Sequence, residues 1–220
     1  MERAAFLAVL RERLSAPAPP RVSAHPPEAC SGVAEAVYRR PLGDRVEAFT
    51  AEAEALGAQV RRVAPGGVPA FLAEVVAVHR TGRAVVSRDP ETAGVAACLA
   101  ARGVEALDWD GPAAAACADL GVTGAVCGIA ATGSIVVAAG RAGGRGASLL
   151  PPVHAALVRE EALLATPADL WRHMGSCFPE GLPSQAVVIT GPSRTGDIEL
   201  VLVRGVHGPG HLWVGLLAAG

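Results

Sequence analysis

The sequence contains no lysine and no cluster of positive charge. Its 19 basic residues are all arginines, they are scattered along the chain, and 21 acidic residues leave a formal net charge of −2. Proteins that bind nucleic acid or an anionic membrane surface gather basic residues on one face or segment. The charge pattern therefore predicts neither partner, and the joint richness in alanine, glycine and arginine indicates a compositional bias of the genome.

Cysteine pairs of the C-x-x-C type are also absent. The five cysteines are Cys30, Cys98, Cys117, Cys127 and Cys177. Their odd number and wide spacing argue against a disulfide framework and against a cysteine-ligated iron–sulfur cluster. We also expect no metal site, because glycine and proline between His207 and His211 prevent the helical face that such a spacing needs. The chain is therefore expected to bind no cofactor of its own.

Two segments bear on membranes and export. Residues 4–10 are apolar, but charged residues 11–13 follow at once, which favours an amphipathic helix of a cytoplasmic protein over a signal peptide. Residues 121–140 carry no charge over a length that can cross a bilayer. Their β-branched residues, with the polar Thr132-Gly133-Ser134 in the middle, favour strands joined by a turn. We therefore expect no membrane insertion.

The order of apolar patterns predicts the fold. With 220 residues, 51% hydrophobic and 18% charged, the chain is long enough for a sizeable core. We expect a helical N-terminal arm over residues 1–57, with a proline-rich break at 17–27, and an α/β domain over residues 58–220. The domain opens with expected strands at 59–63, 84–87 and 104–107, and expected helices at 69–80, 93–102 and 112–120. This alternation is typical of a parallel sheet covered on both faces.

Helical patterns thin out after residue 121. Apolar runs follow at residues 124–129, 134–139, 154–158, 186–190 and 212–217. Since few helices separate these runs, we expect the sheet to become mixed there. The predicted fold class is a three-layer, Rossmann-like α/β domain whose sheet is mostly parallel, with mixed C-terminal strands.

One loop combines glycine, hydroxyl groups and a cation. The expected strand at 186–190 leads into Gly191-Pro192-Ser193-Arg194-Thr195-Gly196-Asp197, and a helix is expected over 198–202. A helix start offers free N–H groups to an anion, and Arg194 would clamp a phosphate or carboxylate. In the alternative interpretation, Ser193 or Thr195 only caps the helix while Asp197 opposes the helix dipole.

Two further features are candidates for chemistry. The glycine-rich loop at residues 140–146 contains two arginines, but it lacks the spacing of a dinucleotide or P-loop motif, so a plain loop is favoured. His154 follows two prolines and His207 stands in a turn-rich segment. Either histidine is a candidate general base or ligand, and the alternative is a histidine that only holds its loop.

Three segments together resemble the LUD-domain family. They are TGSIVV at residues 132–137, SLLPPVHAALV at 148–158 and ITGPSRTGDIELVLVRGVHGP at 189–209. The resemblance is dense over residues 120–217 and weak before them. It implies the fold of the group that contains ribose-5-phosphate isomerase, glucosamine-6-phosphate deaminase and the coenzyme A transferases, which agrees with the α/β pattern.

The resemblance also implies a function. It points to a substrate-handling or accessory subunit in the oxidation of L-lactate to pyruvate, beside partner proteins that carry iron–sulfur clusters. The alternatives are a stand-alone enzyme or binding protein for a phosphosugar or acyl-coenzyme A ligand, and a docking face for the iron–sulfur partners. Many relatives have an acidic residue where this sequence has Ala131, which favours a binding role. The residues expected to hold a small anionic ligand are Gly191, Ser193, Arg194, Thr195, Asp197, Thr132, Gly133, His154 and His207.

Overall fold

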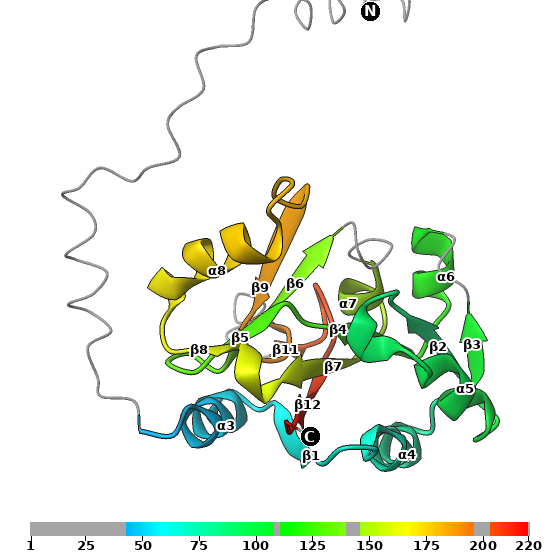
Figure 1. The fold of residues 1–220 in the computed structure, drawn as a ribbon. Coiled ribbons are helices and arrows are strands. Elements are labelled where there is room, and N and C mark those ends of the chain that lie inside the picture. Colours follow the sequence, from blue (N-terminus) through cyan, green and yellow to red (C-terminus); the bar gives the residue numbers. More distant parts are fainter. Residues whose placement is uncertain (1–42, 108–110, 140–145, 196–202, 220) are drawn as a thin grey trace, which may run out of the picture. The chain divides into compact units, whose positions relative to one another are not determined.

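Six parallel strands form the main sheet of the molecule (Figure 1). The computed structural model describes residues 43–107, 111–139, 146–195 and 203–219. In spatial order the strands of the main sheet are β1 (Gln59–Val63), β12 (His211–Leu217), β7 (Val153–Arg159), β4 (Leu120–Gly124), β2 (Arg83–Val86) and β3 (Glu105–Leu107). β7 and β4 are buried almost throughout, as parallel strands covered on both faces are.

A second, smaller sheet contains the mixed strands. Its order is β8 (Leu163–Leu164), β5 (Cys127–Ile129), β6 (Ser134–Ala139) and β9 (Gln185–Ile189). β6 runs antiparallel to both β5 and β9, whereas β8 is parallel to β5. The expected mixed C-terminal strands are therefore present, but they form a sheet of their own. All strands of the main sheet, including the last strand β12, are parallel.

Helices α4 (Val68–His79) and α5 (Val95–Ala100) cover one face of the main sheet. α4 has a proline in its first turn and ends at Arg80, whose left-handed backbone stops the helix. Phe71, Leu72 and Val75 follow the helical spacing and are buried against the sheet. Trp213 of β12 points to the same face and packs edge-on against Phe71.

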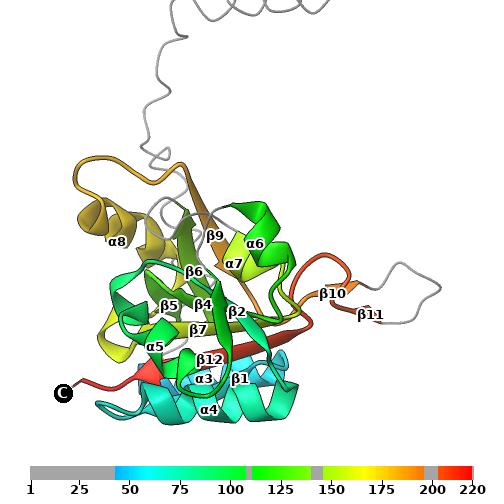
Figure 2. The ribbon, with the colours of Figure 1, turned by 90° about the vertical axis from the view of Figure 1, so that its right-hand side faces the viewer.

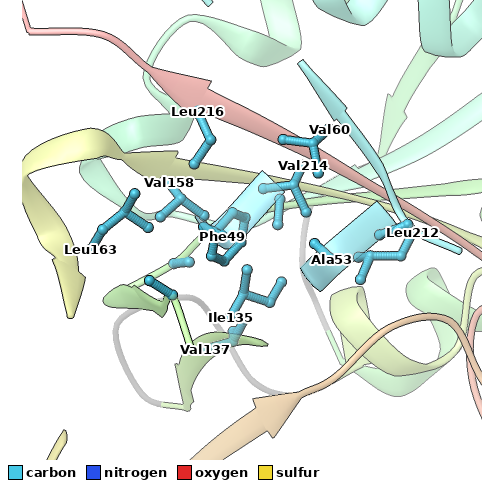
Figure 3. Packing of buried hydrophobic residues seen from close by; sticks show 14 residues of the cluster. Phe49, Ala53, Val60, Ile135, Val137, Val158, Leu163, Leu212, Val214 and Leu216 are labelled. Atoms are coloured by element: carbon cyan, nitrogen blue, oxygen red, sulfur yellow. The ribbon is translucent and has the colours of Figure 1, made fainter. Parts of the chain in front are cut away.

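The other face of the main sheet packs against α3 (Arg45–Ala55) and the small sheet. In Figure 1, α3 and α4 lie on either side of β1. Figure 3 shows Phe49 of α3 between Ile135 of the small sheet and Val158 and Val214 of the main sheet.

The remaining helices are short. α6 (Pro112–Ala116) and α7 (Gly146–Leu149) share a core cluster with β2, and α8 (Leu170–Cys177) packs against β5 and β6. Short 3-10 turns occur at η1 (Pro90–Thr92), η2 (Glu160–Ala162) and η3 (Pro167–Asp169).

The packing of α3 bears on the domain boundary expected at residue 57. Phe49 and Ala53 are fully buried in the core between the two sheets. The compact unit that holds the described residues begins at Arg40. This helix is therefore part of the α/β body and not of an arm that precedes it. Residues 1–42 lie outside the described residues, and the expected arm there stays a prediction.

Most expected strands occur where the sequence pattern places them. β1 and β6 match the expected residues 59–63 and 134–139, and β7, β9 and β12 differ by one residue at most at either end. The run expected at 124–129 is split between the end of β4 and β5, because the chain leaves the main sheet there for the small one. The uncharged residues 121–139 fold as strands β4 to β6, and the described residues contain no helix long and apolar enough to cross a membrane.

The strand expected at residues 186–190 occurs as β9, but the loop expected after it differs from what the structure shows. After β9, Arg194 and Thr195 form strand β10, which pairs antiparallel with β11 (Val203–Arg204). Figure 2 shows these two strands beside the sheets. The expected helix at 198–202 lies outside the described residues and stays a prediction, whereas Arg194 stands in a strand rather than in the expected loop. The anion site expected from a helix N-terminus at Arg194 is therefore not formed by the described residues.

Candidate functional site

A pocket of about 290 Å³ opens where β9 faces the amino ends of β7 and β12. His154 and Leu212 contribute from those two strands, and both are the second residue of their strand. The remaining wall comes from α7, β9, the loop after β9 and the loop before β12. These residues are Ser148, Leu149, Gln185, Val187, Val188, Ile189, Gly191, Pro192, Ser193, His207, Gly208 and Pro209.

A glycine on β4 lets α7 reach the pocket. Gly121 is paired with His154 in the sheet, so both residues point to the same face. A Cβ at Gly121 would lie 1.7 Å from the carbonyl oxygen of Ala147. The backbone of α7 therefore rests directly on β4, and this contact brings Ser148 and Leu149 beside His154.

Two backbone hydrogen bonds join the loops that form the opposite wall. Ser193 N–H donates to the Pro209 carbonyl at 2.8 Å, and Gly205 N–H donates to the Ser193 carbonyl at 3.1 Å. Gly191 has φ +77°, a backbone conformation that favours glycine, and its Cα faces Leu56 closely. Ser193 and His207 are thus held on one wall although they are far apart in the sequence.

His154 is the most deeply buried polar residue of the pocket. Its side chain is fully buried, and Nε2 lies 2.9 Å from the hydroxyl oxygen of Thr123. Nδ1 has no hydrogen-bond partner in the part of the chain that the structure describes. Burial lowers the pKa of His154 from 6.5 to about 4, because the charged imidazolium would lose its water. The imidazole is therefore neutral at physiological pH.

The pocket gathers part of the predicted ligand-binding set. Gly191, Ser193, His154 and His207 line it, together with Gly208 from the same family-like segment. In the sequence, only the family resemblance placed these residues in one predicted site, because no single local motif contains all of them. Thr123, the partner of His154, was missed, because its contact crosses between two strands and leaves no signal in the local sequence.

Arg194 is placed elsewhere. Its guanidinium donates to the carbonyl of Leu56 at the end of α3, where a cation suits the helix dipole. Gly57, with φ +91°, leaves room for the arginine, because a Cβ there would lie 2.5 Å from Nη2. The role of Arg194 as a ligand clamp stays a prediction. Its position at the end of α3 does not support that role. Thr195 is paired with Val203 in the hairpin, and Asp197 lies outside the described residues.

Thr132 and Gly133 form the turn between β5 and β6. The hydroxyl of Thr132 lies 2.7 Å from that of Ser134, which lies 2.8 Å from that of Thr190 after β9. Gly133 has φ +60°, and a Cβ there would lie 2.3 Å from the backbone nitrogen of Ala53. Gly133 therefore allows α3 to pack closely, and the hydroxyl of Thr132 belongs to a chain of contacts that reaches the end of β9. A ligand-binding role for Thr132 and Gly133 stays a prediction.

Other candidate residues fall outside the pocket. Residues 140–145 of the second glycine-rich loop are not described, and Gly146 begins α7. His211 lies against His79 with 4.7 Å between ring centroids, and Trp213 Nε1–H donates to His79 Nε2 at 2.9 Å. Among the described residues no group of three histidine, cysteine or acidic side chains is placed to hold a metal ion.

Known proteins with similar sequences match part of this chain. The chain is 39% identical over 94 residues to "Lactate utilization protein C" of Halalkalibacterium halodurans, an alignment that covers 42% of this chain and 41% of that protein. It is 32% identical over 152 residues to "Lactate utilization protein C" of a Geobacillus species, covering 63% of each chain. The chain thus matches about two fifths to two thirds of the length of these relatives.

The fold is also found in a solved structure. The crystal structure of a DUF162 family protein from Deinococcus radiodurans superposes with a TM-score of 0.60, covers 81% of this chain and 100% of that chain, and is 23% identical. At this identity the likeness shows the α/β fold and nothing finer. The model of the LUD domain matches residues 46–217, from α3 to the end of β12, and the chain therefore belongs to the LUD domain family.

Proposed function

We propose that this chain is a component of an L-lactate utilization system, in which it is a substrate-handling or accessory subunit in the oxidation of lactate to pyruvate. The names of its relatives support the pathway. The pocket supports the handling of a small ligand, since its volume lies near the lower end of the range for small-molecule sites, about 300–1,000 Å³.

The observation that carries the proposal is that two of the segments that resemble the family meet in one pocket, which His154 lines. Ser148, Leu149 and His154 come from the segment at residues 148–158, and the segment at 189–209 supplies Ile189, Gly191, Pro192, Ser193, His207, Gly208 and Pro209. Nδ1 of His154 is buried and has no hydrogen-bond partner in the described part of the chain. A buried polar atom without a partner costs free energy, so its retention points to a ligand that binds it.

The proposal includes partner proteins. Oxidation of lactate to pyruvate releases an electron pair that must be accepted. The cysteine pattern of this chain does not suit an iron–sulfur cluster, so the proposal gives electron transfer to iron–sulfur subunits that work with it. Exposed Leu149 and Val188 at the edge of the pocket are accessible to a partner that covers a bound ligand.

Growth on L-lactate tests this function. A bacterial strain that lacks its own copy of this protein is given the wild type, His154→Gln or His173→Gln. We expect wild type and His173→Gln to restore growth, because His173 on α8 lies outside the pocket, and His154→Gln to fail because the ligand loses its polar contact.

The outcomes separate the parts of the proposal. Failure of the wild type to restore growth, with the protein expressed and folded, would reject the lactate pathway. Full growth with His154→Gln would remove the pocket from the function. Circular dichroism and thermal melting of both variants ensure that lost growth is not lost folding.

A further inference from the structure

The hydrogen-bonding possibilities of His154 and Thr123 can be enumerated. A neutral imidazole carries one N–H, on Nδ1 or on Nε2, and a threonine hydroxyl carries one hydrogen. Thr123 Oγ1 lies 2.9 Å from His154 Nε2, and both side chains are buried. The hydrogen in this contact therefore comes either from the threonine hydroxyl or from the imidazole.

The two arrangements leave different groups unsatisfied. If Nε2–H donates to Thr123, the threonine hydrogen has no acceptor among the described residues, and Nδ1 is left as an unpaired acceptor. If the threonine donates to Nε2, the hydroxyl hydrogen is used and only Nδ1–H lacks a partner. Because each unmet buried donor is unfavourable, the second arrangement is the more stable one.

We propose that Thr123 locks His154 in the tautomer with hydrogen on Nδ1, and that this N–H donates to a carbonyl or carboxylate oxygen of a small acid bound in the pocket. The inference deepens the proposed function and rests on it for the presence of the ligand. It makes Thr123 a positioning residue and His154 a fixed donor. A neutral imidazole whose lone pair is held by Thr123 does not accept a proton from the ligand.

The surroundings agree with an acceptor at this point. Gly121 stands beside His154 on β4 without a side chain, and Leu212 stands beside it on β12, so the neighbouring strands supply no polar competitor for Nδ1. The wall that faces His154 includes Val187 and Ile189. Such a site suits a compact molecule with an oxygen at its buried end and a small apolar body.

Nitrogen NMR of histidine-labelled protein tests the tautomer directly. Long-range proton–nitrogen spectra distinguish protonated from unprotonated ring nitrogens, and His154→Gln identifies the signals of His154. We expect protonated Nδ1 and unprotonated Nε2 in the wild type and in Thr123→Ser, which keeps the hydroxyl. Thr123→Val removes the hydroxyl and should let the other tautomer appear. Protonated Nε2 in the wild type would overturn the inference.

Pyruvate and L-lactate are the probes for the donated hydrogen bond. We expect at least one of them to shift the Nδ1 resonance, and Thr123→Val to weaken its affinity by about tenfold, the effect of one hydrogen bond, while Thr123→Ser binds as the wild type does. If neither acid shifts Nδ1, donation to a small acid is rejected.

Failure of the inference and failure of the proposed function remain distinguishable. Lost growth with His154→Gln combined with protonated Nε2 would keep the function and reject the donor role. The donor tautomer together with full growth of His154→Gln would reject the use of the pocket in lactate utilization.

Discussion

At the scale of a single residue, the burial of His154 makes the stability of the fold depend on pH. Its pKa is about 4 in the folded protein because burial disfavours the imidazolium, whereas the ordinary value is 6.5. Between these values the unfolded chain binds more protons than the folded one, so stability rises with pH across this window. Acidification through it therefore destabilises the fold. His79 acts in the same direction, since burial first and the neighbouring His211 second lower its pKa.

We expect the free energy of unfolding to fall by up to about 3 kcal/mol on account of His154 as pH drops from about 7 to 4. Urea unfolding of the wild type and of His154→Gln at several pH values measures this. Glutamine does not titrate, so the variant should lose less stability on acidification and keep the smaller dependence that His79 gives. An equal loss in both proteins would show that the buried imidazole is not the source.

At the scale of elements, the turn between β5 and β6 decides where α3 can lie. Gly133 has no side chain, and the backbone of Ala53 approaches it so closely that a Cβ would lie 2.3 Å from the amide nitrogen. Phe49, one turn earlier on α3, then fills the space between the two sheets (Figure 3). Phe49 therefore joins the small sheet and the main sheet in one core.

Replacement of Gly133 by alanine should destabilise the protein by about 3 kcal/mol, because the left-handed backbone is strained and α3 must shift. Gly175→Ala is the matched control. Gly175 lies within α8 and a Cβ there meets nothing within 4 Å, so we expect no loss and a gain of up to about 1 kcal/mol. Thermal and urea unfolding of both variants give the comparison, and a Gly133→Ala protein as stable as the control would refute the close packing.

At the scale of the whole molecule, the last strand completes the sheet. β12 lies between β1, from the start of the domain, and β7, and pairs with both in parallel. Leu212, Val214 and Leu216 fill the core toward α3, while Trp213 fills it toward α4. The fold therefore depends on contacts between the two ends of the described region, which are distant in the chain.

A chain that ends after residue 210 should not fold, since β1 would lose its partner and β7 would expose an unpaired edge in the core. Thermal denaturation followed by circular dichroism checks this, and a chain that lacks only Gly220 is the control. A cooperative transition of the shorter chain near that of the control would contradict the central role of β12.

Much of the fold followed from local pattern. Short runs that contain β-branched residues predicted β1 and β6 with their observed bounds, and Pro69 with the apolar spacing of Phe71, Leu72 and Val75 predicted α4. The strand at Arg194 and Thr195 was not expected, because the residue types that cap helices are also those of turns and loops. α8 was not expected, since its polar and apolar residues gave no clear run.

The sequence by itself determined the α/β class, the places of most strands, and the family through three segments of its C-terminal half. It did not determine which strands share a sheet, because pairing depends on long-range contacts that a local pattern does not encode. Tertiary structure alone turned Arg194 toward the end of α3 and brought Thr123 to His154 across two strands. Burial then made the imidazole neutral and left Nδ1 without a partner among the described residues, so the chemistry of the site comes from packing rather than from any motif.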